Sequence, residues 1–284
     1  MKLWYLGTGS SDAIPNPFCE CPTCEEVRKK KGRNIRTRFQ VMIDERLLID
    51  WNADSFMRFQ NANVCLARGP HSILFTHSHD DHLYEREFEN IIEGYCETKP
   101  EDRKPYEIYV GESGYRMFDS WMTSLGKAAE GKYQLHLVHP YDNFEVEGYR
   151  ITAFPADHDP LSSPFNYLIE DGKTSLLLLH DTGYPKEEVW EKWRERKTPF
   201  GCVSLDCNFE WMKGKRNGHM CLEVDEEVVR RMRSLGLVDD KTTLVLSHFG
   251  HCAMSKEAFS YEGMVKRAEP LGFITSFDGM KIEF

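Results

Sequence analysis

The residues from His77 to His82 (His-Ser-His-Asp-Asp-His) concentrate metal-binding groups in one short run after the apolar segment Ser72–Phe75. Imidazole and carboxylate groups are costly to bury alone, and they are the ligands that Zn²⁺, Mn²⁺ and Fe²⁺ accept. The spacing predicts that His77 and His79 leave one side of an extended loop and hold one metal. Asp81 and His82 would then begin a helix and face a second metal. The alternative is a polar loop whose histidines have no common role.

Short β-prone runs and helical segments must position these residues. The predicted strands are Lys2–Leu6, Phe39–Ile43, Leu47–Asp50, Ser72–Thr76, Tyr106–Val110, Gln134–Val138, Phe144–Val146, Arg150–Phe154, Phe165–Glu170, Thr174–Leu179, Cys202–Leu205, Thr243–Leu246 and Gly272–Ser276. The predicted helices are Phe56–Asn61, Glu85–Gly94, Ser113–Gly126, Pro185–Arg196, Glu223–Ser234 and Ser255–Ala268. Turn residues at Asp44–Arg46, Asp171–Lys173 and Asp278-Gly279 predict hairpins. The pattern indicates an α+β fold in which two packed β-sheets carry helices outside, as one domain over residues 1–284.

Composition narrows the cellular setting and the partners. The formal net charge is −10, which argues against a nucleic-acid partner because such partners favour a basic face. No secretory signal and no apolar run of about 20 residues is visible, so we expect a cytoplasmic protein without a membrane contact. The nine cysteines are then thiols or metal ligands instead of disulfides.

The run at residues 77–82 is the signature of the metallo-β-lactamase superfamily, which the chain resembles from end to end. The resemblance implies an αββα sandwich, with two mixed β-sheets inside and helices outside, and a dinuclear metal site. It also implies three further ligands, each after a predicted strand: His158 for the first metal, Asp181 as the bridging carboxylate and His248 for the second metal. Taken singly, each could be structural. His180, beside Asp181, is expected to have a structural or supporting role.

A second metal motif lies at Cys19-Glu20-Cys21-Pro22-Thr23-Cys24. Structural zinc takes four closed ligands, and His251 is a candidate for the fourth. The alternative is three free thiols in a loop. With the preceding turn Gly7–Pro15, the motif resembles the phosphoribosyl cyclic phosphodiesterases of the carbon–phosphorus lyase pathway. That resemblance implies a structural zinc on Cys19, Cys21, Cys24 and His251, which pins a loop beside the active site.

The same resemblance assigns chemistry to several residues. Two divalent cations, zinc or manganese, would share a bridging hydroxide that attacks phosphorus, with Asp81 and Asp181 orienting it. In the pair Gly218-His219, His219 would contact the phosphate or protonate the leaving oxygen, although a surface loop histidine is the alternative. Asp50 would support the ligand histidines or be a buried structural residue. We therefore expect a hydrolase for a small phosphodiester, first of all a cyclic ribose phosphate.

Other functions compete with this interpretation. A tRNA 3′-end processing endonuclease shares the ligand order, but the chain is acidic and has no insertion resembling a tRNA-gripping arm. Thioester or lactam hydrolysis uses the same metals, while the Gly-His pair favours phosphate. A non-catalytic accessory protein of cofactor biosynthesis shares the cysteine motif but typically lacks a catalytic ligand. Two segments depart from the relatives at the expected pocket rim, Leu83–Glu89 and Thr98–Pro105. Homodimers are common among the relatives, and a homodimer is the assembly to test.

Overall fold

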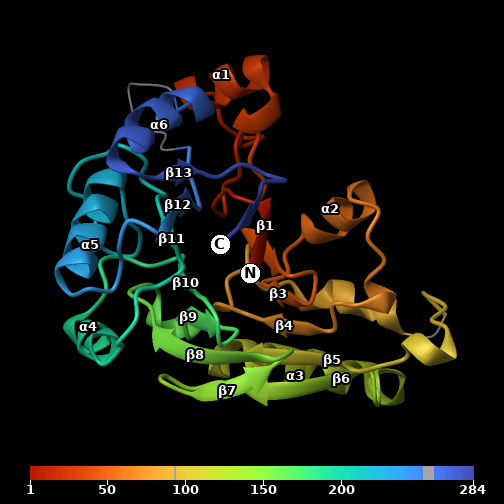
Figure 1. Cartoon of the computed structure of the whole chain (residues 1–284). Helices are drawn as coiled ribbons and strands as arrows, with labels where there is room; N and C mark the ends of the chain where they lie inside the picture. The colour runs from red at the N-terminus through yellow and green to blue at the C-terminus, as the bar shows by residue number, and fades with distance from the viewer. Residues whose placement is uncertain (93, 252–258) are drawn as a thin grey trace.

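Two seven-stranded sheets make up the centre of the computed structural model, which describes residues 1–92, 94–251 and 259–284 (Figure 1). The first sheet has the order β14 (Lys281–Glu283), β1 (Lys2–Gly7), β2 (Gln40–Ile43), β3 (Leu47–Ile49), β4 (Ser72–Leu74), β5 (Tyr106–Val110) and β6 (Tyr133–Leu137). The second has the order β13 (Ile274–Thr275), β12 (Thr243–Ser247), β11 (Cys202–Asp206), β10 (Ser175–Leu179), β9 (Phe165–Glu170), β8 (Tyr149–Pro155) and β7 (Asn143–Val146). Both sheets are mixed, with parallel pairing along β3 to β6 and along β10 to β13.

Helices cover the outer faces of the sheets. The described α-helices are α1 (Pro22–Lys30), α2 (Ser55–Asn61), α3 (Glu112–Leu125), α4 (Glu187–Arg194), α5 (Leu222–Ser234) and α6 (Tyr261–Ala268). Short 3₁₀ helices span Gly32–Asn34, Leu66–Arg68, Glu85–Ile91, Pro100–Asp102, Gly126–Ala129, Pro160–Ser162 and Glu269–Leu271. In the described part of the chain, no helix combines the length and the apolar character needed to cross a membrane.

The buried side chains form three layers, as an αββα sandwich requires. Strand β10 shows why: Leu176 and Leu178 belong to the apolar cluster between the two sheets, whereas Leu177 and Leu179 belong to the outer cluster. Successive strand residues point to opposite faces, so a strand that is apolar throughout is covered on both sides. The outer cluster includes side chains of α4, α5 and α6, and a third cluster packs α2 and α3 on the first sheet. The predicted fold class is confirmed.

Two of the three predicted hairpins are present. Residues 44–46 join β2 to β3, with positive φ angles of 46° at Asp44 and 57° at Glu45, and residues 171–174 join the antiparallel strands β9 and β10. The hairpin predicted at Asp278-Gly279 is wrong, because β13 ends in the second sheet and β14 begins in the first. The Asp278 carboxylate accepts hydrogen bonds from the backbone N–H groups of Thr8 (2.9 Å) and Thr37 (2.7 Å). These bonds hold the chain where it crosses between sheets.

Several helix predictions need correction. Asp81 and His82 lie in a turn and do not begin a helix, because the His82 carbonyl accepts a hydrogen bond from the Trp51 N–H at 2.9 Å instead of from a following helical turn. The segment predicted as the helix Glu85–Gly94 is a 3₁₀ helix over Glu85–Ile91. The prediction Ser255–Ala268 falls partly on residues outside the described ones, and the observed helix is α6. Helix α1 and strand β14 were not predicted.

Candidate metal centre

The predicted ligands gather at one edge of the sandwich, where the parallel strands end. The run at residues 77–82 follows β4, His158 follows β8, Asp181 follows β10 and His248 follows β12. Asp181 and His248 have positive φ angles of 48° and 59°, a conformation that residues with a Cβ rarely adopt. Backbone strain of this kind is concentrated at functional sites. Here the positive φ angles turn both side chains out of the strand direction.

Three imidazoles form the first group. Nε2 of His77 lies 3.0 Å from Nδ1 of His79, and Nε2 of His158 lies 3.2 Å from the same atom. These separations are similar to those between neighbouring nitrogen ligands of a tetrahedral zinc ion with Zn–N bonds of about 2.0–2.1 Å. The donor set therefore fits a metal ion.

Four buried residues form the second group: Asp81, His82, Asp181 and His248. Nε2 of His82 and Nε2 of His248 lie 2.8 Å and 2.9 Å from Oδ2 of Asp181. None of these three atoms has an aligned hydrogen-bond partner among the described residues. Buried polar atoms that converge without hydrogen bonds are costly, and a divalent cation would satisfy all of them at once.

Asp181 connects the two groups. Its Oδ2 faces His82 and His248, while its Oδ1 lies 3.6 Å from Nε2 of His158 in the first group. Burial alone would raise the pKa of Asp181, but the neighbouring His248 and His82 outweigh burial and hold that pKa well below the ordinary range. The position is that of a carboxylate able to bridge two cations.

Hydrogen bonds behind the imidazoles decide which ring nitrogen faces inward. Nδ1 of His77 lies 3.0 Å from Oγ1 of Thr76, and Nδ1 of His82 lies 2.7 Å from Oδ2 of Asp50. Nδ1 of His158 lies 3.1 Å from the carbonyl oxygen of residue 218. An acceptor at Nδ1 leaves Nε2 with a free lone pair, which is how outer partners orient metal-binding histidines. Asp50 is fully buried, and its carboxylate is the partner of Nδ1 of His82.

His79 has the opposite orientation. Its Nδ1 faces the other two imidazoles, and its Nε2 lies 3.2 Å from Oδ2 of Asp159. His180 belongs to neither group: its Nε2 lies 2.9 Å from Oγ of Ser204, and its ring stacks on Phe39 with centroids 4.2 Å apart. Burial lowers the pKa of His180 to about 3, so it is a neutral packing residue.

Asp206, at the end of β11, was not assigned a role from the sequence. Its fully buried carboxylate has Oδ2 3.1 Å from Nδ1 of His248 and 2.9 Å from Nδ1 of His219, and accepts the backbone N–H of Asp181 at 3.0 Å. The available signal was its place after an apolar parallel strand, where the chain supplies functional groups at the neighbouring strand ends. Asp206 thus lies behind His248 and His219, as Asp50 lies behind His82.

His219 lies at this centre and not on a distant surface loop. Its ring is 4.9 Å from the ring of His158 and stacks near that of His248, with centroids 5.5 Å apart. Burial alone would lower the pKa of His219, but the carboxylate of Asp206 outweighs it and raises the pKa. With Nδ1 turned to Asp206, Nε2 of His219 is the nitrogen left for a ligand or substrate.

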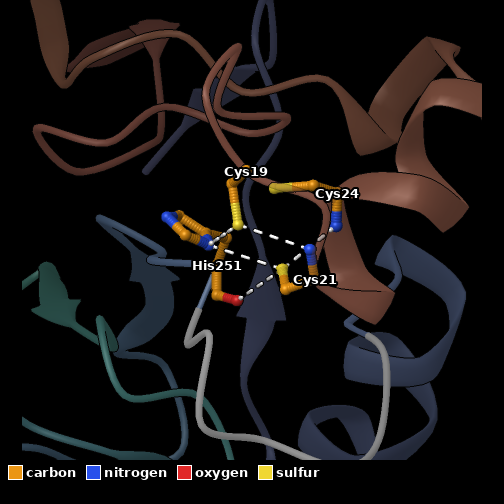
Figure 2. Close-up of side chains that lie close together, drawn as sticks. All are labelled: Cys19, Cys21, Cys24 and His251. Carbon is orange, nitrogen blue, oxygen red and sulfur yellow. Dashed lines mark hydrogen bonds between the residues drawn. The ribbon is translucent and has the colours of Figure 1, made fainter.

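The cysteine motif forms a separate group. Figure 2 shows Cys19, Cys21, Cys24 and His251 close together, with Nδ1 of His251 3.6 Å and 3.5 Å from the sulfurs of Cys19 and Cys21. One ligand atom from each of the four residues lies within 4.8 Å of the others. Burial is the main cause that raises the pKa of Cys24 to about 12, and a bound cation is what would turn this thiol into a thiolate. Three cysteines and one histidine fit a structural zinc site.

The segments on either side of this group are far apart in sequence. Cys21 is the N-cap of α1, and its sulfur accepts the Cys24 N–H at 3.4 Å, so the helix presents Cys24 from its first turn. His251 comes three residues after His248 and turns its Nε2 to Asp12 at 3.4 Å. A metal ion here would therefore join the N-terminal segment to the strand end that carries His248.

Comparison with known proteins agrees with this fold. The family model described as the β-lactamase superfamily domain matches residues 45–249. No curated protein matches the chain. The structure is similar to a new diphosphatase from the PhnP family, with 19% identity and a TM-score of 0.73 over 100% of this chain and 97% of that chain.

Two more solved structures share the architecture. One is Zn²⁺-bound PqqB from Methylobacterium extorquens, with 17% identity and a TM-score of 0.70 over 100% of both chains. The other is the short form of human tRNase Z, with 16% identity and a TM-score of 0.65 over 100% of this chain and 99% of that chain. At these identities the likeness establishes the fold. With a family model matched over most of its length and two sheets in the αββα arrangement, the chain belongs to the metallo-β-lactamase superfamily, whose fold serves metal-dependent hydrolases.

Proposed function

We propose that this protein is a dinuclear metal-dependent phosphodiesterase for a small substrate, in the first instance a cyclic ribose phosphate. The observation that carries the proposal is His219, held by Asp206 at 2.9 Å directly beside two proposed metal ligands. An imidazole whose pKa is raised can donate a proton or a hydrogen bond to an oxygen that gains negative charge. Such a group assists the hydrolysis of a phosphodiester whose leaving group is an alkoxide.

The proposed ligands of the first cation are His77, His79 and His158, and those of the second are Asp81, His82 and His248, with Asp181 between them. Zinc or manganese ions bound by these residues would supply an activated water and would stabilise negative charge on the phosphoryl oxygens. Asp81 and Asp181 are the carboxylates of the second group, and in this proposal they orient the attacking water and accept its proton.

The position of Lys215 is a further argument for an anionic substrate. Its ammonium lies 5.4 Å from the centroid of the Phe209 ring, and that ring lies 5.8 Å from the ring of His219. Among the described residues, no carboxylate pairs with Lys215 within 4.0 Å. A cation that is fixed by an aromatic face and free of a counter-ion can contact a second negative group of the substrate.

Hydrolysis of bis(p-nitrophenyl) phosphate with added Mn²⁺ or Zn²⁺ tests the proposal. We expect metal-dependent turnover that Asp81→Ala abolishes and that Asp80→Ala retains. Asp80 is the matched control because it is adjacent, exposed and outside the metal groups. Absence of turnover in protein shown to contain its metals would favour a thioester-type substrate or a non-catalytic binding role instead.

A further inference from the structure

A cavity of about 590 Å³ lies apart from the metal centre, against the outer side of the first sheet. Its walls come from α2, from the 3₁₀ helix Glu85–Ile91 and from residues 96–106. None of the proposed metal ligands lines it. The volume is in the range of pockets that bind small organic molecules.

Aromatic rings form much of its wall. They are Trp51, Phe56, Phe59, Phe88 and Tyr106. The Trp51 indole stacks on Phe59 with centroids 5.5 Å apart and an interplanar angle of 11°, and it is 5.3 Å from the ring of Phe88. Packed rings keep the faces of their neighbours fixed, and an aromatic face attracts a cation.

One carboxylate stands among these rings. Oε2 of Glu87 accepts a hydrogen bond from Nε1 of Trp51 at 2.9 Å. Among the described residues, no lysine, arginine or histidine lies within 4.0 Å of Glu87. Glu87 is half-buried, and this burial raises its pKa, because partial removal from water without a counter-ion disfavours the charged form.

The charged side chains that line the cavity also favour a positively charged ligand. Four acidic residues line it (Glu87, Glu97, Asp102 and Glu130), against three lysines and arginines (Arg103, Lys104 and Lys132). The whole chain has a formal net charge of −10, so its long-range field also favours a positive ligand.

We propose that this cavity binds a small organic cation, an amine or quaternary ammonium with an apolar body, whose positive charge pairs with Glu87 while its body contacts Trp51 and its neighbouring rings. The proposal is independent of the phosphodiesterase chemistry, because it concerns other side chains in another part of the fold.

Calorimetric titration of the metal-loaded protein with three probes of the same body tests it: 4-phenylbutylammonium, 4-phenylbutan-1-ol and 4-phenylbutanoate. We expect the ammonium to bind at least about tenfold more tightly than the alcohol, and the carboxylate to bind most weakly. Glu87→Gln should remove the preference for the ammonium because it removes the negative charge. Its amide oxygen can still accept the hydrogen bond from Trp51, so the packing of the rings should be retained. Glu130→Gln, at the rim, should retain it.

Phe56→Ala locates the binding site without disturbing the buried rings, because Phe56 is 40% exposed. We expect it to weaken binding of the ammonium while the melting temperature stays close to that of the wild type. Equal affinity for the ammonium and the alcohol would mean an apolar pocket without charge selection and would overturn the proposal. Tightest binding of the carboxylate, unchanged binding by Glu87→Gln or Phe56→Ala, or no binding of any probe would overturn it as well.

Discussion

The carboxylate of Asp206 lies 2.9 Å from Nδ1 of His219, and the same oxygen lies 3.1 Å from Nδ1 of His248. One buried acid thus orients a proposed metal ligand and the proposed substrate-contacting residue together. The backbone N–H groups of Asn208 (3.0 Å) and Met220 (3.1 Å) hold the other oxygen of this acid, Oδ1, in place. The proposed metal binding and the proposed proton transfer would therefore depend on one side chain that is not itself a proposed ligand.

Replacing Asp206 by Asn should impair both functions. The amide NH₂ would meet the Nδ1–H groups of the two histidines, which favours the tautomer with a proton on the inward nitrogen. We expect kcat for bis(p-nitrophenyl) phosphate to fall about 10–100-fold, as for other partners of metal-binding histidines, and metal content to fall. Steady-state kinetics and metal analysis measure the two effects. An unchanged Asp206→Asn enzyme would remove Asp206 from the proposed machinery.

Lys215→Ala should change substrate preference. If the Lys215 ammonium contacts a second anionic group, KM should rise several-fold for ribose 1,2-cyclic phosphate with a 5-phosphate. It should stay constant for the same compound without that phosphate, and kcat should change little for either. Lys213→Ala, two residues away and exposed, is the matched control. Equal effects of Lys215→Ala on both substrates would contradict a role in recognising the second anion.

The cysteine group should hold one zinc ion independently of the dinuclear centre. Cys24→Ser should lower the zinc content by about one ion per chain and lower the melting temperature, because the zinc would join residues 19–24 to residue 251. Metal analysis with calorimetry measures both quantities. Cys65→Ser is the control, since Cys65 is exposed and lies outside the candidate metal groups. Loss of stability without loss of zinc would show that Cys24 acts by packing alone.

Asp225 should make stability depend on pH. Burial raises the pKa of this fully buried carboxyl well above its ordinary range, so the folded state keeps its proton at pH values where the unfolded state has lost it. The unfolded state therefore binds fewer protons, and stability falls as pH rises above about 4, by up to about 1.4 kcal/mol per pH unit.

Asp225→Asn imitates the protonated acid and removes this penalty. We expect its free energy of unfolding in urea to exceed that of the wild type by an amount that grows between pH 5 and pH 8. Comparison of the two proteins at each pH cancels effects that they share, including metal loss in acid. A difference that stays constant or shrinks as pH rises would show that Asp225 is ionised in the folded protein.

The sequence by itself determined the layers and most of the proposed site. Fully apolar strands such as Ser175–Leu179 can be stable only when both faces are covered, and this requirement leads to two sheets with helices outside. The run from His77 to His82 places three imidazoles and two carboxylates within six residues, and these groups are metal ligands. For these features, local pattern and chemistry point to the same answer.

Only the tertiary structure decided how distant segments meet. It placed Asp206 between His219 and His248, which no local pattern could indicate because a single aspartate after a strand has many uses. It also placed β14 in the first sheet, so the chain crosses between the sheets at Asp278, where the turn residues alone predicted a hairpin. Asp81 and His82 lie in a turn in the folded protein, because the backbone N–H of Trp51 donates a hydrogen bond to the His82 carbonyl. In each case a contact between segments remote in the chain outweighed the local preference.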